Sequence, residues 1–228
     1  MEEAGVTGEP MGSEGRQEAE APGPKGTDST VWVEGLVEDL LAHPATDRQV
    51  EVVEAQLDRF PRGMVAVGAR CVCGNPLAVV TRPRLPDGTP FPTTCYLTSP
   101  EAVKAVSRLE ADGSMARYTL LIGQDARIAQ EYARAHAVYL AFRHALADRL
   151  GDEEGRIAGV SAGGMPIRVK CLHALVAQSL VMGEGVNPIG DMALDRIRTD
   201  FDPSVCRCAD PWPGLAGRQS HEGGARLG

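Results

Sequence analysis

Two short motifs contain the residue types that bind transition metals. They are Cys71-x-Cys73-Gly74 and, much later in the chain, Cys171-x-His173. Thiolate and imidazole groups are preferred ligands of zinc and of iron centres, which usually take four protein ligands. A Cys-x-Cys-Gly turn can present two sulfur atoms to one ion. The sequence therefore predicts a metal site formed by Cys71, Cys73, Cys171 and His173, with zinc or an iron–sulfur cluster as the cofactor.

The Cys171-x-His173 spacing restricts how such a site could form. Residues two positions apart on an α-helix are separated by about 200° of rotation, so one helical turn cannot point both at one ion. They converge only if the chain is unwound there, close to the glycine-rich segment that precedes it. The alternative is that Cys171 packs as a small apolar residue in the core and His173 lies at its edge.

The remaining cysteines leave further ligand sets open. Cys206-x-Cys208 could complete a four-cysteine site with the turn at Cys71 and Cys73, although a site in a terminal tail needs a preformed partner in the core. Cys95 is a substitute ligand if the fold brings it close. All of these sets include the turn.

A glycine-rich loop over residues 159–164 predicts an anion as the alternative ligand. Two consecutive glycines let backbone N–H groups turn outward, and the helix expected after Pro166 would present its positive N-terminus. Basic side chains on this segment and on a proline-rich loop over residues 81–93 could converge on a phosphate or carboxylate. The alternative is an ordinary helix start with solvated basic side chains. The candidate anion-binding residues are Arg82, Arg84, Gly163, Gly164, Arg168 and Lys170.

The same loop matches the nucleophile-elbow pattern, Gly159-x-Ser161-x-Gly163. That chemistry requires a strand running into the serine and a histidine later in the chain. The later histidines are His173, inside the expected helix, and His221, in the tail. No pair of carboxylates lies in a clearly apolar setting either, so the sequence names no catalytic residue and leaves open whether the protein is an enzyme.

Composition narrows the class of protein. The chain has 228 residues and a net charge of −8, and its first 30 residues carry seven acidic and two basic side chains. This charge disfavours a nucleic-acid-binding surface, which needs clustered Lys and Arg. No apolar run reaches the roughly 18 residues of a membrane span, and no basic start precedes an apolar run. We expect a cytoplasmic protein with reduced cysteines.

The periodicity predicts a helix-rich α+β domain with a few short strands near its N-terminal part. Residues 1–30 form an expected disordered acidic leader, residues 31–202 the single globular domain, and residues 203–228 a disordered tail. The predicted strands lie at 64–67, 77–80 and 95–98. The predicted helices cover about 46–60, 99–113 and 125–150, with another after Pro166 and a short last one capped by Asp191.

Four stretches resemble a known family. They are Arg70-Cys-Val-Cys-Gly-Asn-Pro76, Arg82-Pro-Arg-Leu-Pro-Asp-Gly-Thr-Pro-Phe-Pro-Thr93, Gly164-Met165-Pro166 with Arg168-Val-Lys-Cys-Leu-His173, and Asn187-Pro188 with Gly190-Asp191. In this order they are similar to domain-of-unknown-function family 501, which occurs mainly in actinobacteria, over about residues 45–198. The resemblance implies no established activity. Members are often encoded beside an exopolyphosphatase and a septum-formation initiator protein. Related chains commonly carry Cys, Asp and His where this chain has Ser99, Ile167 and Gln178.

These observations lead to one main hypothesis and two alternatives. The main hypothesis is a metal- or anion-binding regulatory module whose site lies where the turn, the proline-rich loop and the glycine-rich loop meet. One alternative is an enzyme acting on a phosphorylated or polyphosphate-like substrate. The other is an interaction protein linked to cell division. The expected partner is accordingly a phosphate-containing ligand or another protein. Neither a membrane nor a nucleic acid is an expected partner.

Overall fold

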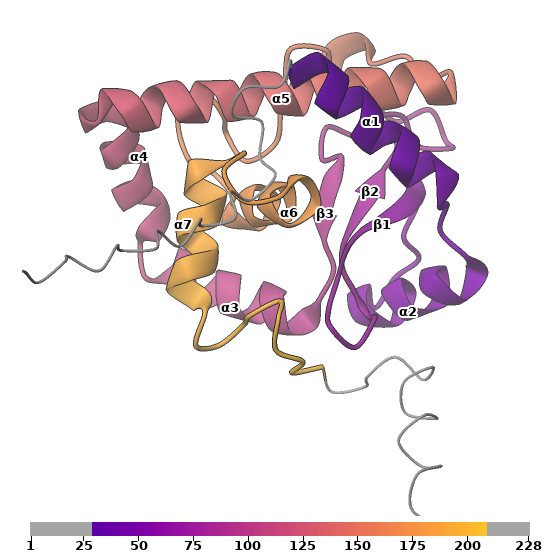
Figure 1. Ribbon diagram of the computed structural model, residues 1–228, viewed down its shortest axis with the longest axis horizontal. Helices are drawn as coiled ribbons and strands as arrows, with labels where there is room; N and C mark the ends of the chain where they lie inside the picture. The colour runs from indigo at the N-terminus through magenta and orange to yellow at the C-terminus, as the bar shows by residue number, and fades with distance from the viewer. Residues whose placement is uncertain (1–28, 209–228) are drawn as a thin grey trace, which may run out of the picture.

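The computed structural model describes residues 29–208, and the regions predicted to be disordered lie largely outside this range. Within it the chain forms seven α-helices and one three-stranded sheet (Figure 1). The prediction of a helix-rich α+β domain with its strands near the N-terminal part is confirmed. The elements are α1 (Ser29–Ala42), α2 (Asp47–Leu57), β1 (Met64–Arg70), β2 (Pro76–Thr81), β3 (Cys95–Leu97), α3 (Pro100–Ala111), α4 (Ser114–Gln124), α5 (Ala126–Leu150), a 3-10 turn (Gly155–Ile157), α6 (Leu172–Met182) and α7 (Pro188–Ile197).

The sheet is antiparallel, with β2 in the middle. Val79 lies opposite Val67 on β1 and opposite Tyr96 on β3. Every residue of β2 is buried, as expected for a strand covered on both faces. The tight turn between β1 and β2 is closed by the Cys71 N–H, which donates to the Asn75 carbonyl at 2.9 Å. This hairpin confirms the two strands and the turn that the sequence predicts.

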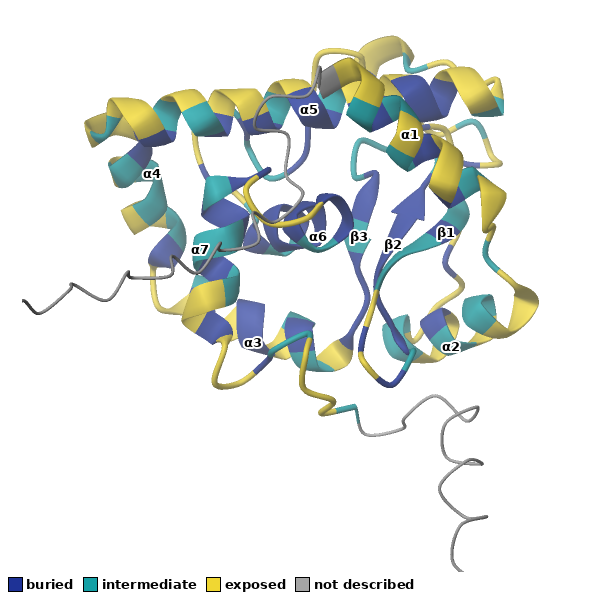
Figure 2. Ribbon diagram, viewed as in Figure 1, coloured by how far each residue is buried: buried dark blue, intermediate teal, exposed yellow. Residues whose placement is uncertain are grey.

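Helix α6 lies at the centre of the molecule, between α5 on one side and α3 on the other (Figure 2). It packs on all three strands and on α7. Nine of its eleven residues are buried, which is typical of a helix that is apolar on all sides. The approach of α7 is close because Gly190 has no side chain. A Cβ there would lie 2.4 Å from the Leu175 carbonyl oxygen.

The long helix α5 begins after Asp125, as predicted, and its stripe of Tyr132, Tyr139 and Phe142 is fully buried. The Tyr139 hydroxyl accepts a hydrogen bond from the Thr94 N–H at 2.6 Å and so ties the helix to the start of β3. Arg143, on the same helix, is also fully buried, and its guanidinium group donates hydrogen bonds to Glu154 and to nearby backbone carbonyls.

Two predicted helix starts are wrong in position. Helix α6 begins at Leu172 and not after Pro166, because residues 166–171 form an irregular loop. Helix α7 is capped by Asn187, whose side chain accepts from the Ile189 and Gly190 N–H groups, and not by Asp191. Helices α1 and α4 were not predicted from the sequence.

Candidate functional site

The turn between β1 and β2 holds two thiols at the end of the sheet. Cys71 and Cys73 are 6% and 7% exposed. The Gly74 N–H donates to the Cys71 carbonyl at 2.7 Å, and Gly74 has a φ of 96°. A positive φ favours glycine, so Gly74 allows the turn to fold back tightly after the second cysteine. The turn therefore presents both sulfur atoms on one side.

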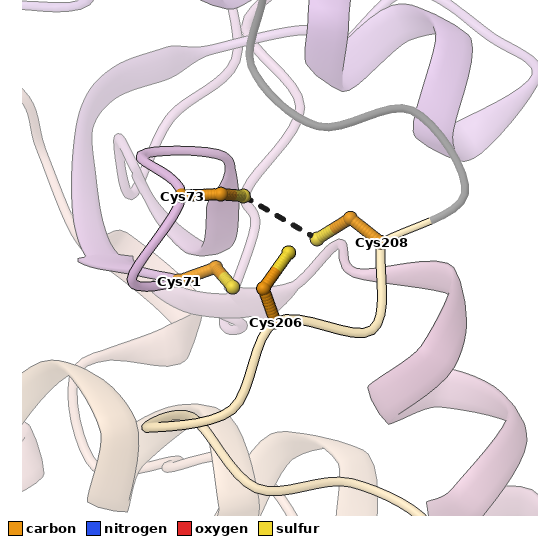
Figure 3. Close-up of side chains that lie close together, drawn as sticks. All are labelled: Cys71, Cys73, Cys206 and Cys208. Carbon is orange, nitrogen blue, oxygen red and sulfur yellow. Dashed lines mark hydrogen bonds between the residues drawn. The ribbon is translucent and has the colours of Figure 1, made fainter. Parts of the chain in front are cut away.

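A second pair of thiols reaches this turn from the C-terminal segment (Figure 3). Beyond α7 the chain is anchored by Phe201, which is 4% exposed. Asp202 then forms a compact turn in which its carboxylate accepts the Ser204 N–H at 2.8 Å. The chain continues to Cys206 and Cys208, whose side chains point toward the hairpin.

The four sulfur atoms form one compact group. Those of Cys71, Cys73, Cys206 and Cys208 all lie within 4.8 Å of one another. The Cys73 and Cys208 sulfurs are 3.7 Å apart. In a tetrahedral site with metal–sulfur bonds of about 2.3 Å, adjacent sulfurs are about 3.8 Å apart. The group therefore has the donor set and the spacing of a mononuclear tetrathiolate centre.

Burial affects the protonation of two of these thiols. It is the main cause that raises the pKa of Cys71 and of Cys208, and a hydrogen bond from Cys73 raises the pKa of Cys208 further. Without a cation, these two thiols are therefore expected to remain protonated. A metal ion that binds here displaces those protons, because the thiolate is the ligand form.

The structure does not bring the four predicted metal ligands together. Cys71 and Cys73 belong to the group just described, whereas Cys171 and His173 form a second group with Glu110. Cys171 is the N-cap of α6 and has an extended backbone, with φ −155° and ψ 112°. It therefore lies outside the helical turn, which is how two side chains with this spacing point to the same place.

Distances within the second group are short. The His173 Nδ1 atom is 3.2 Å from Glu110 Oε1 and 4.0 Å from Cys171 Sγ. The hydrogen bond with Cys171, and then the charge of Glu110, raise the pKa of His173 against the opposing effect of its burial. Glu110 is the member that the sequence analysis missed, since nothing in its spacing on α3 marks it. Cys95 belongs to neither group and is fully buried in the core.

The predicted anion-binding arginines have carboxylate partners within the chain. Arg82 donates two hydrogen bonds to Asp152, at 3.0 and 2.6 Å, and Arg84 contacts Glu153 at 3.2 Å. The Asp152 side chain is 7% exposed and that of Arg82 is 34% exposed, whereas the pair of Arg84 and Glu153 is open to solvent. The positive charges of Arg82 and Arg84 are therefore already balanced within the chain.

The glycine-rich loop forms hydrogen bonds with the backbone that directly follows it. The carbonyls of Gly163 and Gly164 accept the N–H groups of Lys170 and Arg168, at 2.7 and 3.2 Å. The N-terminus of α6 begins after this loop, and its Leu172 N–H donates to the Glu110 carboxylate at 2.6 Å. An internal carboxylate thus occupies the position in which an external anion was expected. The side chains of Arg168 and Lys170 are exposed.

Ser161, the serine of the elbow pattern, has a histidine partner from an earlier part of the chain. Its Oγ is 2.8 Å from His136 Nδ1, on α5. Burial, and secondarily the charge of Arg143, lower the pKa of His136. The serine is 8% exposed and follows a turn, not the strand that a nucleophile elbow requires. The pair links α5 to the loop.

Comparison with known proteins gives one match. A family model described as protein of unknown function (DUF501) matches residues 67–195. The match includes Cys71, Cys73, Glu110, Cys171 and His173, and it ends before the C-terminal cysteine pair. No curated protein and no solved structure matches the chain. Among the described residues, no helix is both long enough and apolar enough to span a membrane.

Proposed function

The chain belongs to the DUF501 family of proteins of unknown function, and we propose that this member is a metal-binding regulatory module. Its centre is one zinc ion held by Cys71, Cys73, Cys206 and Cys208. The observation that carries the proposal is the convergence of four sulfur atoms from two distant segments to within 4.8 Å of one another. Four thiolates this close together repel one another unless a cation lies between them, and two of them, Cys71 and Cys73, are also buried.

Zinc fits this donor set better than an iron–sulfur cluster. Closed four-cysteine sites with tetrahedral geometry are typical of structural zinc. A cluster would place several iron and sulfide atoms between the cysteines, which would hold their sulfurs farther apart than the 3.7 Å between Cys73 and Cys208. The spacing therefore supports a single ion.

The regulatory part of the proposal comes from a cavity beside the site. A cavity of about 430 Å³ is lined by Arg70 of β1, Asp191 of α7 and residues 201–204 of the C-terminal segment. Cys206 follows this wall by two residues, and Arg70 is adjacent to Cys71. A metal bound to both cysteine pairs would fix the wall in place. We therefore expect metal occupancy to control the shape of the cavity.

Asp191 contributes a carboxyl group to the wall of the cavity. Its Oδ2 atom accepts the Gly185 N–H at 2.8 Å, which ties α7 to the preceding loop. Burial raises the pKa of this carboxyl group, because a low-dielectric environment disfavours the charged form. We therefore expect a change in the shape of the cavity to change the protonation of Asp191.

Metal analysis of the full-length chain, purified without a tag, tests the proposal. We expect zinc in the wild-type protein with four sulfur neighbours at about 2.3 Å in X-ray absorption. The Cys206→Ser/Cys208→Ser variant should lose this four-sulfur signal. Cys95→Ala, which removes a thiol outside the cluster, should keep it. A wild-type protein without a four-sulfur metal, or a double variant that retains one, would contradict the proposal.

A further inference from the structure

The group formed by Glu110, Cys171 and His173 has the geometry of a second metal site, of a different kind. Its three ligand atoms lie within 4.8 Å of one another. With typical zinc bond lengths, a tetrahedral site separates nitrogen from oxygen by about 3.3 Å and nitrogen from sulfur by about 3.6 Å. The observed separations from His173 Nδ1 are 3.2 Å to oxygen and 4.0 Å to sulfur. The nitrogen–oxygen separation thus already matches such a site, and the nitrogen–sulfur separation exceeds it by a few tenths of an ångström.

The surroundings of His173 are those of a metal ligand. Its Nε2 atom is 3.3 Å from the Val103 carbonyl oxygen and 3.2 Å from Ser107 Oγ. Metal-bound histidines usually donate the N–H of their second nitrogen to a carbonyl or carboxylate, which fixes the tautomer. With the proton on Nε2, the lone pair of Nδ1 faces Glu110 and Cys171. Three electron-rich atoms then converge on one point.

The other ligands are also held in place by the backbone. The Leu172 N–H donates to Glu110 Oε1 at 2.6 Å, which orients the carboxylate. Val103, Ser107 and Glu110 follow one another on α3 at positions i, i+4 and i+7, so one face of α3 supplies the carboxylate and both partners of the imidazole. Cys171 and His173 come from the start of α6.

Solvent reaches this group. The side chains of His173 and Glu110 are 26% and 21% exposed, in contrast to the buried turn cysteines of the tetrathiolate group. Three protein ligands leave one tetrahedral position vacant, which is the arrangement of catalytic and not of structural zinc sites.

We propose that Glu110, Cys171 and His173 form an open site for a divalent transition metal of the zinc type. The fourth position takes water or an oxygen atom of a substrate. The site is distinct from the tetrathiolate centre and does not depend on it. Its mixture of one nitrogen, one oxygen and one sulfur donor suits zinc, and cobalt(II) is the spectroscopic substitute for zinc in such a site.

Titration of metal-free, full-length Cys206→Ser/Cys208→Ser protein with cobalt(II) isolates this site. We expect one equivalent to bind, with visible ligand-field bands and a charge-transfer band from a single thiolate. Adding Cys171→Ser should remove the charge-transfer band. Ser107→Ala should weaken binding by about 10- to 100-fold, since it removes a partner of the histidine. His43→Gln, which changes an exposed histidine directly after α1, is the matched control and should bind as before.

The wild-type protein gives an independent readout. It should bind two cobalt ions, and azide should shift only the bands of the open site. If the wild type binds one ion with a tetrathiolate spectrum and the double variant binds none, the group is an ion pair of protonated His173 with Glu110 and the inference is overturned. If the wild type binds one ion with a single-thiolate spectrum, the inference holds and the tetrathiolate proposal fails.

Discussion

Cleavage of the chain after Arg207 should depend on metal. Arg207 lies between the two C-terminal cysteines, so trypsin can cut there only when the segment leaves the hairpin. Its anchor in the core is Phe201, which is 4% exposed, and the following turn is closed by the Val205 N–H donating to the Asp202 carbonyl at 3.0 Å. Residues 204–207 are exposed. Little besides the sulfur group holds this part of the segment against the domain.

The size of the effect follows from linkage. A metal that binds only the closed segment reduces the open population by a factor of one plus the ratio of free metal to Kd, which is about 100-fold at 100 times Kd. This corresponds to about 2.7 kcal/mol. When opening and closing are fast relative to cleavage, the cleavage rate follows the open population. We therefore expect cleavage after Arg207 to be about 100-fold faster in chelator than in zinc at 100 times Kd.

Mass spectrometry of timed tryptic digests measures this rate, and a short arginine peptide in the same reaction reports the activity of trypsin itself. The Cys206→Ser/Cys208→Ser variant should be cut at the fast rate with or without zinc. Cys95→Ala should behave as the wild type. The reasoning is refuted if zinc leaves the wild-type rate unchanged, or if the double variant is still protected by zinc.

Three further outcomes test the packing around the site. Gly190→Ala should destabilise the domain by about 1–3 kcal/mol or more, because its Cβ would clash with the backbone of α6. Gly123→Ala in α4, where a Cβ meets nothing within 4 Å, should be neutral or stabilising, and denaturant unfolding compares the two. Arg143→Met should cost about 3–5 kcal/mol by the same measurement, because it removes the guanidinium donor from the largely buried Glu154 carboxylate and from the Ile157 and Val160 carbonyls; a loss under 1 kcal/mol would contradict this. Burial raises the pKa of the Cys95 thiol, so iodoacetamide should label Cys95 only after denaturation, and labelling of the native protein would show that the core opens.

Local patterns of the sequence predicted the elements whose positions depend on local chemistry. The capping box at Thr46 and Gln49, the serine–proline start of α3 and the Cys71–Gly74 turn all lie where the sequence placed them. Each depends on hydrogen bonds within about four residues, and such signals can be read from a single chain. The stripe of α5 was equally clear because it repeats over more than six turns.

Other features were not predicted, either because a local signal was overlooked or because they depend on residues distant in the sequence. Val33, Val37 and Leu40 have helical spacing and are buried, so α1 had a usable signal that the composition of the preceding leader obscured. The burial of Arg143 depends on a loop more than ten residues later that wraps over its guanidinium group. The sequence marked the cysteine pairs, but the pairing of the turn with Cys206 and Cys208, and not with Cys171, depends on how the chain returns after α7.

The glycine pair has a structural role that the sequence did not indicate. Gly163 and Gly164 were expected to expose N–H groups to an anion, and in the structure both have positive φ values and fold the loop onto itself. A Cβ on Gly163 would lie 3.2 Å from the Cys171 carbonyl oxygen. A Cβ on Gly164 would lie 2.6 Å from the Arg168 carbonyl oxygen. Because of this tight loop the chain stays irregular up to Cys171, and α6 begins at the next residue, Leu172. Had the helix begun at Pro166, Cys171 and His173 would point about 200° apart. The glycines therefore act on the open metal site by fixing where the helix begins.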